Sequence, residues 1–235
     1  MAPATVDRAY ILHLRPYTDS RVIIEFLTCH QGLIHAVARK PGKRDRAKFE
    51  AFQPVNIELI GASELKTLRY CEQVAESSPV ALLGTSLFCG LYLNELLQKL
   101  LPPGESFANL FYFYEITLQH LRRGTTQKEF EAALRQMEFF LLAELGFALD
   151  FSSCCTTDLS VKADQVYRYR VGEGFSEIEA NTKTYDTLIP GAHLLALANA
   201  EFTDPDVLKT AKIIARKALA SLLDGRPLKS RELFN

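Results

Sequence analysis

The sequence predicts an α+β protein, in which an N-terminal five-stranded barrel precedes a mainly helical domain with a small β-rich insertion. Three observations predict this class. Short β-branched and aromatic runs fill the N-terminal third, apolar residues recur at helical spacing from about residue 81, and an irregular stretch follows Phe151. We therefore expect two domains, 1–80 and 81–235, with the insertion at about 151–190.

The first domain is expected to contain five strands, because its apolar runs are short and are bounded by turn residues. A Pro41-Gly42 pair favours a turn after the third run. Five strands in so short a segment are typical of a small closed barrel. The expected strands cover residues 9–14, 22–28, 32–38, 55–60 and 66–72.

The second domain begins with three expected helices. The first runs from about Ala81 to a stop at 102–104, where two prolines and a glycine end it, and the second covers 107–121. The third begins at Thr126, whose side chain can form a capping box with Glu129, and Gly146 is its expected stop.

The remainder combines the insertion with two further helices. A hairpin is expected through 166–171 with a turn at 172–174. Helical spacing returns at 191–199 and again at 204–223, where Asp204 is the expected cap and proline occupies the first helical position.

Composition indicates an ordinary soluble globular protein, with 48% hydrophobic and 23% charged residues and a formal net charge of -1. No apolar run approaches the roughly 18 residues of a membrane span, and the short run at 9–14 is followed by Arg15-Pro16, unlike a signal peptide. Five cysteines without paired spacing favour reduced thiols. We expect a cytoplasmic location.

Charge is unevenly distributed along this nearly neutral chain. Residues 1–70 carry 11 basic and 7 acidic side chains, whereas residues 71–150 carry 5 and 10. A cluster of cations favours phosphate binding whatever the base sequence, because each neutralised phosphate releases counterions. The alternative is a solvated surface loop. Six basic residues lie between positions 39 and 48: Arg39, Lys40, Lys43, Arg44, Arg46 and Lys48.

Other N-terminal residues could extend this candidate DNA site. Arg15 and Arg69 lie on nearby expected strands and add two cations. Four rings could stack on bases, although core packing or ordinary exposure explains each of them more simply. These rings are Tyr17, Phe49, Phe52 and Tyr70.

Five segments resemble the RecO family of bacterial recombination mediators, in the family's order along the chain. They are RPYTDSRVIIEFLT (Arg15–Thr28), Gln53-Pro54, LYLNELL (Leu91–Leu97), Leu134–Gly146 and LKSRELF (Leu228–Phe234). The resemblance implies an N-terminal OB-fold, a helical C-terminal domain, and binding of single- and double-stranded DNA. It also implies annealing of complementary strands, loading of the recombinase RecA with RecR and single-strand binding protein, and association with the nucleoid.

The resemblance also implies a partner site. Arg135 matches the arginine of the family's LR..E motif, which is associated with the acidic C-terminal tail of single-strand binding protein. The alternative is a surface salt bridge from Arg135 to Glu131 or Glu138 at helical spacing.

Zinc is not expected, although some relatives hold it in the insertion through two cysteine pairs. Here that stretch has only the adjacent Cys154 and Cys155, which cannot supply four tetrahedral ligands. We expect no metal and no cofactor.

Two other classes of function remain open. An enzyme could pair Cys154 or Cys155 with His193 or His120, or His13 with Asp19, but no catalytic motif fixes such geometry. Annealing needs no catalytic residue, so we expect none. A helical protein–protein adaptor would leave the basic loop as solvated surface, and a DNA titration at varied salt would separate it from a mediator.

Overall fold

The computed structural model describes residues 5–42, 49–74, 81–178 and 187–234. The chain forms two compact units. Unit 1 comprises Met1–Gly124 together with Leu228–Asn235, and unit 2 comprises Thr125–Pro227. The first two helices therefore pack in the same unit as the strands, although the sequence analysis assigned them to the helical domain.

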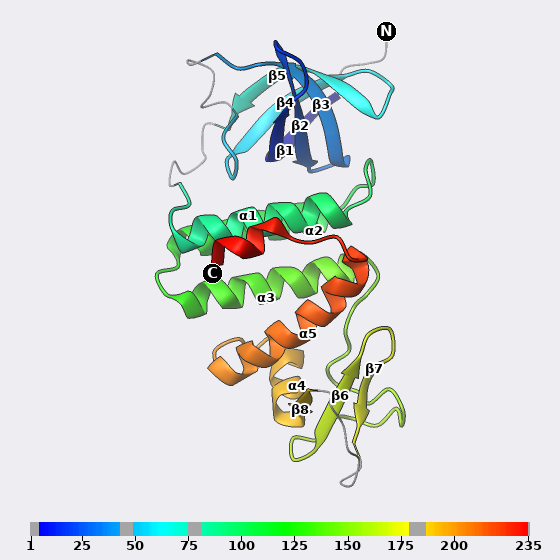
Figure 1. Cartoon of the computed structure of the whole chain (residues 1–235). Helices are drawn as coiled ribbons and strands as arrows, with labels where there is room; N and C mark the ends of the chain where they lie inside the picture. Colours follow the sequence, from blue (N-terminus) through cyan, green and yellow to red (C-terminus); the bar gives the residue numbers. More distant parts are fainter. Residues whose placement is uncertain (1–4, 43–48, 75–80, 179–186, 235) are drawn as a thin grey trace. The chain divides into compact units, whose positions relative to one another are not determined.

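The five expected strands form the closed, OB-like barrel that the sequence predicted (Figure 1). Neighbours follow the order β1–β2–β3–β5–β4, and pairing of β4 with β1 closes the barrel. All of these pairs are antiparallel except β3 with β5. The strands are β1 (Thr5–Pro16), β2 (Arg21–Thr28), β3 (Gly32–Arg39), β4 (Pro54–Ile60) and β5 (Leu65–Gln73).

Alternation along the strands builds the barrel core, because successive side chains point to opposite faces of a strand. On β2, for example, Val22, Ile24 and Phe26 are buried in one cluster. Phe49, from the segment before β4, packs against this cluster while remaining partly exposed.

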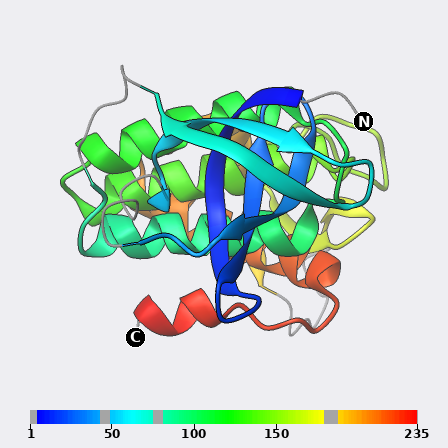
Figure 2. The ribbon, with the colours of Figure 1, turned by 90° about the horizontal axis from the view of Figure 1, so that it is seen from above.

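Helices α1 (Thr85–Leu100) and α2 (Ala108–Arg123) pack across one end of the barrel (Figures 1 and 2). The buried Asn94 on α1 joins three elements, because its side-chain nitrogen donates to Leu12 O of β1 at 3.0 Å and its oxygen accepts from the Tyr114 hydroxyl of α2 at 2.6 Å. Helix α1 begins at Thr85, later than predicted, because Gly84 lies outside the helix with a φ of +53°.

A 3₁₀ helix, η2 (Lys229–Phe234), returns to unit 1 and lies along α1, which the sequence did not predict. The Glu95 carboxylate of α1 accepts from the Lys229 and Ser230 backbone N–H groups at 3.0 and 2.8 Å, and from the Ser230 hydroxyl at 2.6 Å. The Phe234 ring packs edge-on against Phe88, with 6.2 Å between ring centroids.

The described part of unit 2 contains three helices, and the predicted helix caps are confirmed. In α3 (Gln127–Glu144), Thr126 and Glu129 form a capping box, and Gly146 follows the helix with a φ of +83°. Asp204 caps α5 (Pro205–Leu223) by accepting from the Asp206 N–H at 2.7 Å. The short α4 (Gly191–Ala198) precedes it.

A small sheet completes unit 2, with antiparallel strands in the order β7–β6–β8. The predicted hairpin is confirmed as β6 (Val166–Arg170) and β7 (Gly174–Glu177). The third strand, β8 (Leu188–Pro190), pairs with the other edge of β6. Tyr167 and Tyr169 on β6 are both buried. In the described parts of both units, no helix is long and apolar enough to cross a membrane.

Candidate nucleic-acid interface

Strands β3 and β5 pair over only part of their length. Their parallel register runs from His35 opposite Leu65 to Val37 opposite Thr67. Beyond this point β3 continues beside β2 as far as Arg39, while β5 continues beside β4 as far as Gln73. Residues 38–39 of β3 and residues 68–73 of β5 are therefore not paired with each other in the barrel wall.

A groove of about 510 Å³ lies where this pairing ends. We call it the seam groove. One wall comes from the end of β3 and the segment after it, a second from β5, and Phe49 contributes a third side. The lining residues are Ala38, Arg39, Lys40, Pro41, Gly42, Phe49, Leu68, Arg69, Tyr70 and Cys71.

The seam groove brings together three of the predicted DNA-binding cations, Arg39, Lys40 and Arg69. All three side chains are exposed. The Lys40 backbone N–H donates to Ser20 O at 2.8 Å, which ties the end of β3 to the turn between β1 and β2. Arg69 Nη1 lies 3.0 Å from Glu58 Oε1, so Arg69 also has an anionic neighbour.

Arg21 is an exposed cation that the sequence analysis missed. It faces Arg39 directly in the β2–β3 register. Like charges at opposite positions of an antiparallel pair repel, and an anion placed between them would relieve this repulsion. The signal in the sequence was its place at the start of β2, immediately after the Asp19-Ser20 turn.

The remaining predicted cations divide into two groups. Arg15 is exposed on β1, with its Nε 3.6 Å from Glu25 Oε1, and it does not line the seam groove. The other four, Lys43, Arg44, Lys48 and Arg46, lie outside the described residues. Their roles therefore remain predictions from the sequence.

The four candidate stacking rings have different environments. Tyr17 and Tyr70 are about half exposed, at 53% and 48%. Phe49 is partly buried, whereas Phe52 is a core residue at 6% exposure. The Tyr70 hydroxyl donates a hydrogen bond to Glu72, and this bond raises the pKa of the phenol. Of these four rings, Tyr70 is the one that is both about half exposed and part of the lining of the seam groove.

Arg135 on α3 lies in a different environment from these exposed cations. It is buried at 5% exposure, and its Nη2 lies 2.8 Å from Oε1 of the fully buried Glu138. Its Nε and Nη1 are also buried and have no hydrogen-bond partner in the described structure. The expected salt bridge from Arg135 to Glu138 therefore exists, but it is buried and not on the surface. The other candidate partner, Glu131, pairs with α5 instead, with its Oε1 3.3 Å from Lys212 Nζ.

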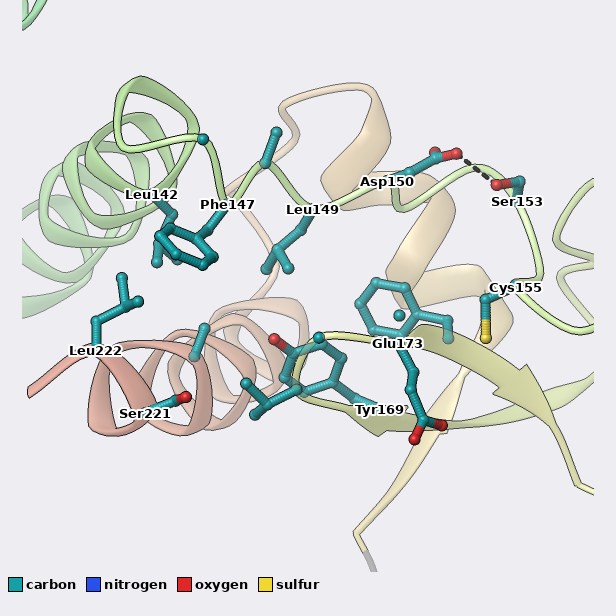
Figure 3. Close-up of a pocket in the computed structure, with 17 residues that line it drawn as sticks. Leu142, Phe147, Leu149, Asp150, Ser153, Cys155, Tyr169, Glu173, Ser221 and Leu222 are labelled. Atoms are coloured by element: carbon teal, nitrogen blue, oxygen red, sulfur yellow. Dashed lines mark hydrogen bonds between the residues drawn. The ribbon is translucent and has the colours of Figure 1, made fainter. Parts of the chain in front are cut away.

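A second cavity, of about 540 Å³, lies within unit 2 (Figure 3). Phe147, from the segment after α3, and Leu222 of α5 point into it, and Asp150 at its rim accepts a hydrogen bond from Ser153. Its lining includes the carboxylates of Asp150 and Glu173 but, among the described residues, no lysine, arginine or histidine. This cavity lacks the cations that a phosphate would need.

Two of the residues considered for catalysis, His193 and Cys154, lie beside hydroxyl groups. His193 Nδ1 lies 2.8 Å from Thr210 Oγ1, and Cys154 Sγ lies 3.2 Å from Thr156 Oγ1. Burial opposes ionisation of Cys154, but hydrogen bonds to its sulfur, including those from the hydroxyls of Thr156 and Thr157, outweigh burial and lower the pKa of the thiol to about 6. No group of three potential metal ligands gathers in the part of the chain that is described.

Comparisons with known proteins match both parts of the chain. Residues 1–76 match the family model Recombination protein O N terminal, and residues 84–232 match Recombination protein O C terminal. The chain is 38% identical to the DNA repair protein RecO of Alteromonas mediterranea, over 96% of this chain and 95% of that protein. It is 39% identical to the proteins of that name from Proteus mirabilis and Yersinia enterocolitica, over 97% of this chain and 91% and 93% of theirs.

Proposed function

Because the chain belongs to the RecO family, and so has a role in DNA repair and recombination, we propose that it is a recombination mediator that binds and anneals DNA. The observation that carries the DNA-binding part is the seam groove. There Arg39, Lys40 and Arg69 line one open cavity together with the exposed ring of Tyr70. This is the combination by which an OB-fold holds single strands: cations along the phosphates and a ring beside a base.

Annealing follows from charge neutralisation. Two complementary strands repel one another through their phosphates, and a cationic surface lowers that repulsion while the bases supply specificity. Nothing in this process needs a proton transfer or a nucleophile. We therefore retain the prediction that the chain is not an enzyme.

The proposal is tested by reversing two groove charges in the full chain, Arg39→Glu with Arg69→Glu. Binding to a fluorescent oligothymidylate is measured between about 50 and 200 mM salt. The slope of log affinity against log salt is negative, and each lost phosphate contact should reduce its magnitude by about 0.7. Annealing should slow in parallel. Unchanged affinity, slope and annealing rate would exclude the groove as the DNA site.

We further propose that the chain acts with RecR to load RecA onto DNA coated with single-strand binding protein, at a cytoplasmic, nucleoid-associated location. The test is a RecA loading assay on coated DNA with each protein omitted in turn. Loading that is independent of this chain would contradict the proposal. An adaptor that does not bind DNA predicts instead that the groove reversal leaves loading unchanged.

For the acidic tail of single-strand binding protein we propose a contact with Arg135. Support comes from Arg135 Nε and Nη1, which are buried and have no hydrogen-bond partner among the described residues and could donate to a carboxylate that reaches them. Arg135→Ala should lower affinity for the tail peptide severalfold and leave DNA binding intact. Fluorescence anisotropy at low salt measures this, with the exposed cation variant Lys128→Ala as control. Equal peptide affinity in wild type and Arg135→Ala, with both proteins folded, would remove Arg135 from the site.

A further inference from the structure

Phe52 has a backbone conformation that is unusual for its residue type. Its φ is +67°, in the left-handed region that glycine adopts readily and a bulky aromatic residue rarely does. Such a residue persists only when its surroundings hold it in place, and backbone strain of this kind is concentrated near functional sites. Phe52 lies in the turn that leads into β4, and its side chain is buried.

Two contacts from the helices of unit 1 hold this turn. The Arg122 guanidinium of α2 donates a hydrogen bond to the Phe52 carbonyl oxygen. The Phe52 ring lies against Gly90 of α1 so closely that a Cβ added at Gly90 would be 2.8 Å from Phe52 Cε1. Gly90 thus leaves room for the ring, and Arg122 fixes the backbone.

The turn held in this way carries one side of the seam groove. Phe49 precedes Phe52 by three residues, lines the groove and packs against the barrel core. The other two sides lie on β3 and β5, where pairing to β2 and β4 fixes the backbone. Phe49 lies outside the strands, so the position of its side of the groove depends on the contacts at Phe52.

We propose that Arg122 and Gly90 are positioning residues for DNA binding, which act through Phe52 to set the Phe49 side of the seam groove. The inference rests on the proposed function of that groove. It makes α1 and α2 part of the DNA-binding apparatus without requiring either helix to touch DNA. The family match that begins at residue 84 would then include residues needed by the site on the barrel.

Two variants of the full chain test this positioning role. Gly90→Ala changes no charge and places a methyl group against the Phe52 ring and against Leu82, while Arg122→Met removes the donor to the Phe52 carbonyl. For each, affinity for fluorescent oligothymidylate is measured across a salt series, and thermal unfolding is followed by circular dichroism. Both should bind about fivefold more weakly at low salt while the salt slope stays unchanged, because the groove cations lie on the other two sides.

Two further variants separate position from charge and from folding. Arg123→Met removes the same charge from an exposed residue on the same helical turn and should bind as wild type. Arg122→Lys keeps a donor and should retain more affinity than Arg122→Met. If Arg122→Met does not fold, Gly90→Ala and Arg122→Lys decide the question.

The outcomes distinguish the inference from the proposed function. A lower melting temperature with unchanged affinity in both anchor variants would make the Phe52 contacts purely structural and overturn the inference. If the Arg39→Glu, Arg69→Glu reversal still weakens binding in that case, the seam groove stands without the anchor. If that reversal has no effect either, the groove itself is not the DNA site.

Discussion

The arginines of the two units differ in what surrounds them. Arg39 and Arg69 of unit 1 are exposed at an open groove, whereas Arg135 of unit 2 is buried against a fully buried carboxylate. An exposed cation keeps most of its hydration and can exchange counterions for phosphates, so its effect depends on salt. A buried ion pair has lost that hydration, so each charge is stabilised mainly by the other and removing one of them is costly. The same residue type therefore lies exposed at a groove in one unit and buried in an ion pair in the other.

The largest effect that would sharpen this contrast is a loss of stability in Arg135→Ala. Removing the guanidinium takes away the cation that lies 2.8 Å from the buried Glu138 carboxylate, and breaking a buried ion pair in this way typically costs about 3 to 5 kcal/mol of unfolding free energy. Urea denaturation at neutral pH measures the change.

The matched control removes both charges, as Arg135→Met with Glu138→Leu. This double variant should be close to wild type in stability, because no buried charge is left unpaired. If single and double variants lose the same free energy, the cost arises from packing and the electrostatic contrast between the units fails.

A second prediction concerns two of the predicted cations that lie outside the described residues. Arg44→Glu with Arg46→Glu should weaken single-stranded DNA binding and annealing while the melting temperature stays the same. The salt slope should fall by about 0.7 for each of these cations that meets a phosphate. Lys209→Glu with Arg216→Glu, on exposed positions of α5, makes the same charge change in unit 2 and is the control. Equal affinity of the Arg44→Glu, Arg46→Glu variant and wild type at about 50 mM salt would contradict the prediction.

A third prediction concerns Glu95, a partly buried carboxylate of unit 1. Burial opposes ionisation of Glu95, but donors on Ser230, Lys99 and Lys229 outweigh it and lower its pKa from 4.5 to about 2. A pKa that is lower in the folded state contributes stability above the ordinary value, and this contribution is lost as pH falls through 4.5 toward 2.

Between pH 5 and pH 3, wild type should therefore lose about 1 to 2 kcal/mol more stability than Glu95→Gln, after allowance for solvent screening. Chemical denaturation at each pH measures the difference. Parallel pH profiles for the two proteins would show that η2 does not hold the carboxylate in solution.

The smallest expected effect is none at all, and it concerns the cysteines of unit 2. We expect no stoichiometric zinc, so a chelator should leave the melting temperature unchanged, because a structural zinc would contribute folding free energy directly. Metal analysis that finds about one zinc per chain would refute this and would give unit 2 a source of stability that unit 1 lacks.

Local patterns were enough to predict most elements of both units, although not β8 or η2. Alternation and turn residues predicted all five barrel strands, and the spacing from Thr126 to Glu129 predicted the cap of α3. These features depend on residues close together in the chain, where steric and hydrogen-bonding preferences act directly.

Features that depend on distant residues could not be predicted in this way. Helical spacing indicated a partner for Arg135 but not its burial, which depends on tertiary packing. The end of β3–β5 pairing, which creates the seam groove, depends on strands about thirty residues apart. The left-handed conformation of Phe52 has no local signal, because a residue of its type ordinarily avoids it.

The return of η2 to unit 1 has a consequence for biosynthesis. Residues 228–235 leave the ribosome after the whole of unit 2, yet they belong to the compact unit formed by residues 1–124. During translation Glu95 and Phe88 of α1 therefore lack their contacts with η2 until more than a hundred further residues have been made. Domains generally fold as units in the order of synthesis. Here the first unit to emerge is the last to be completed, and a chain that stops before Leu228 would leave this face of α1 open.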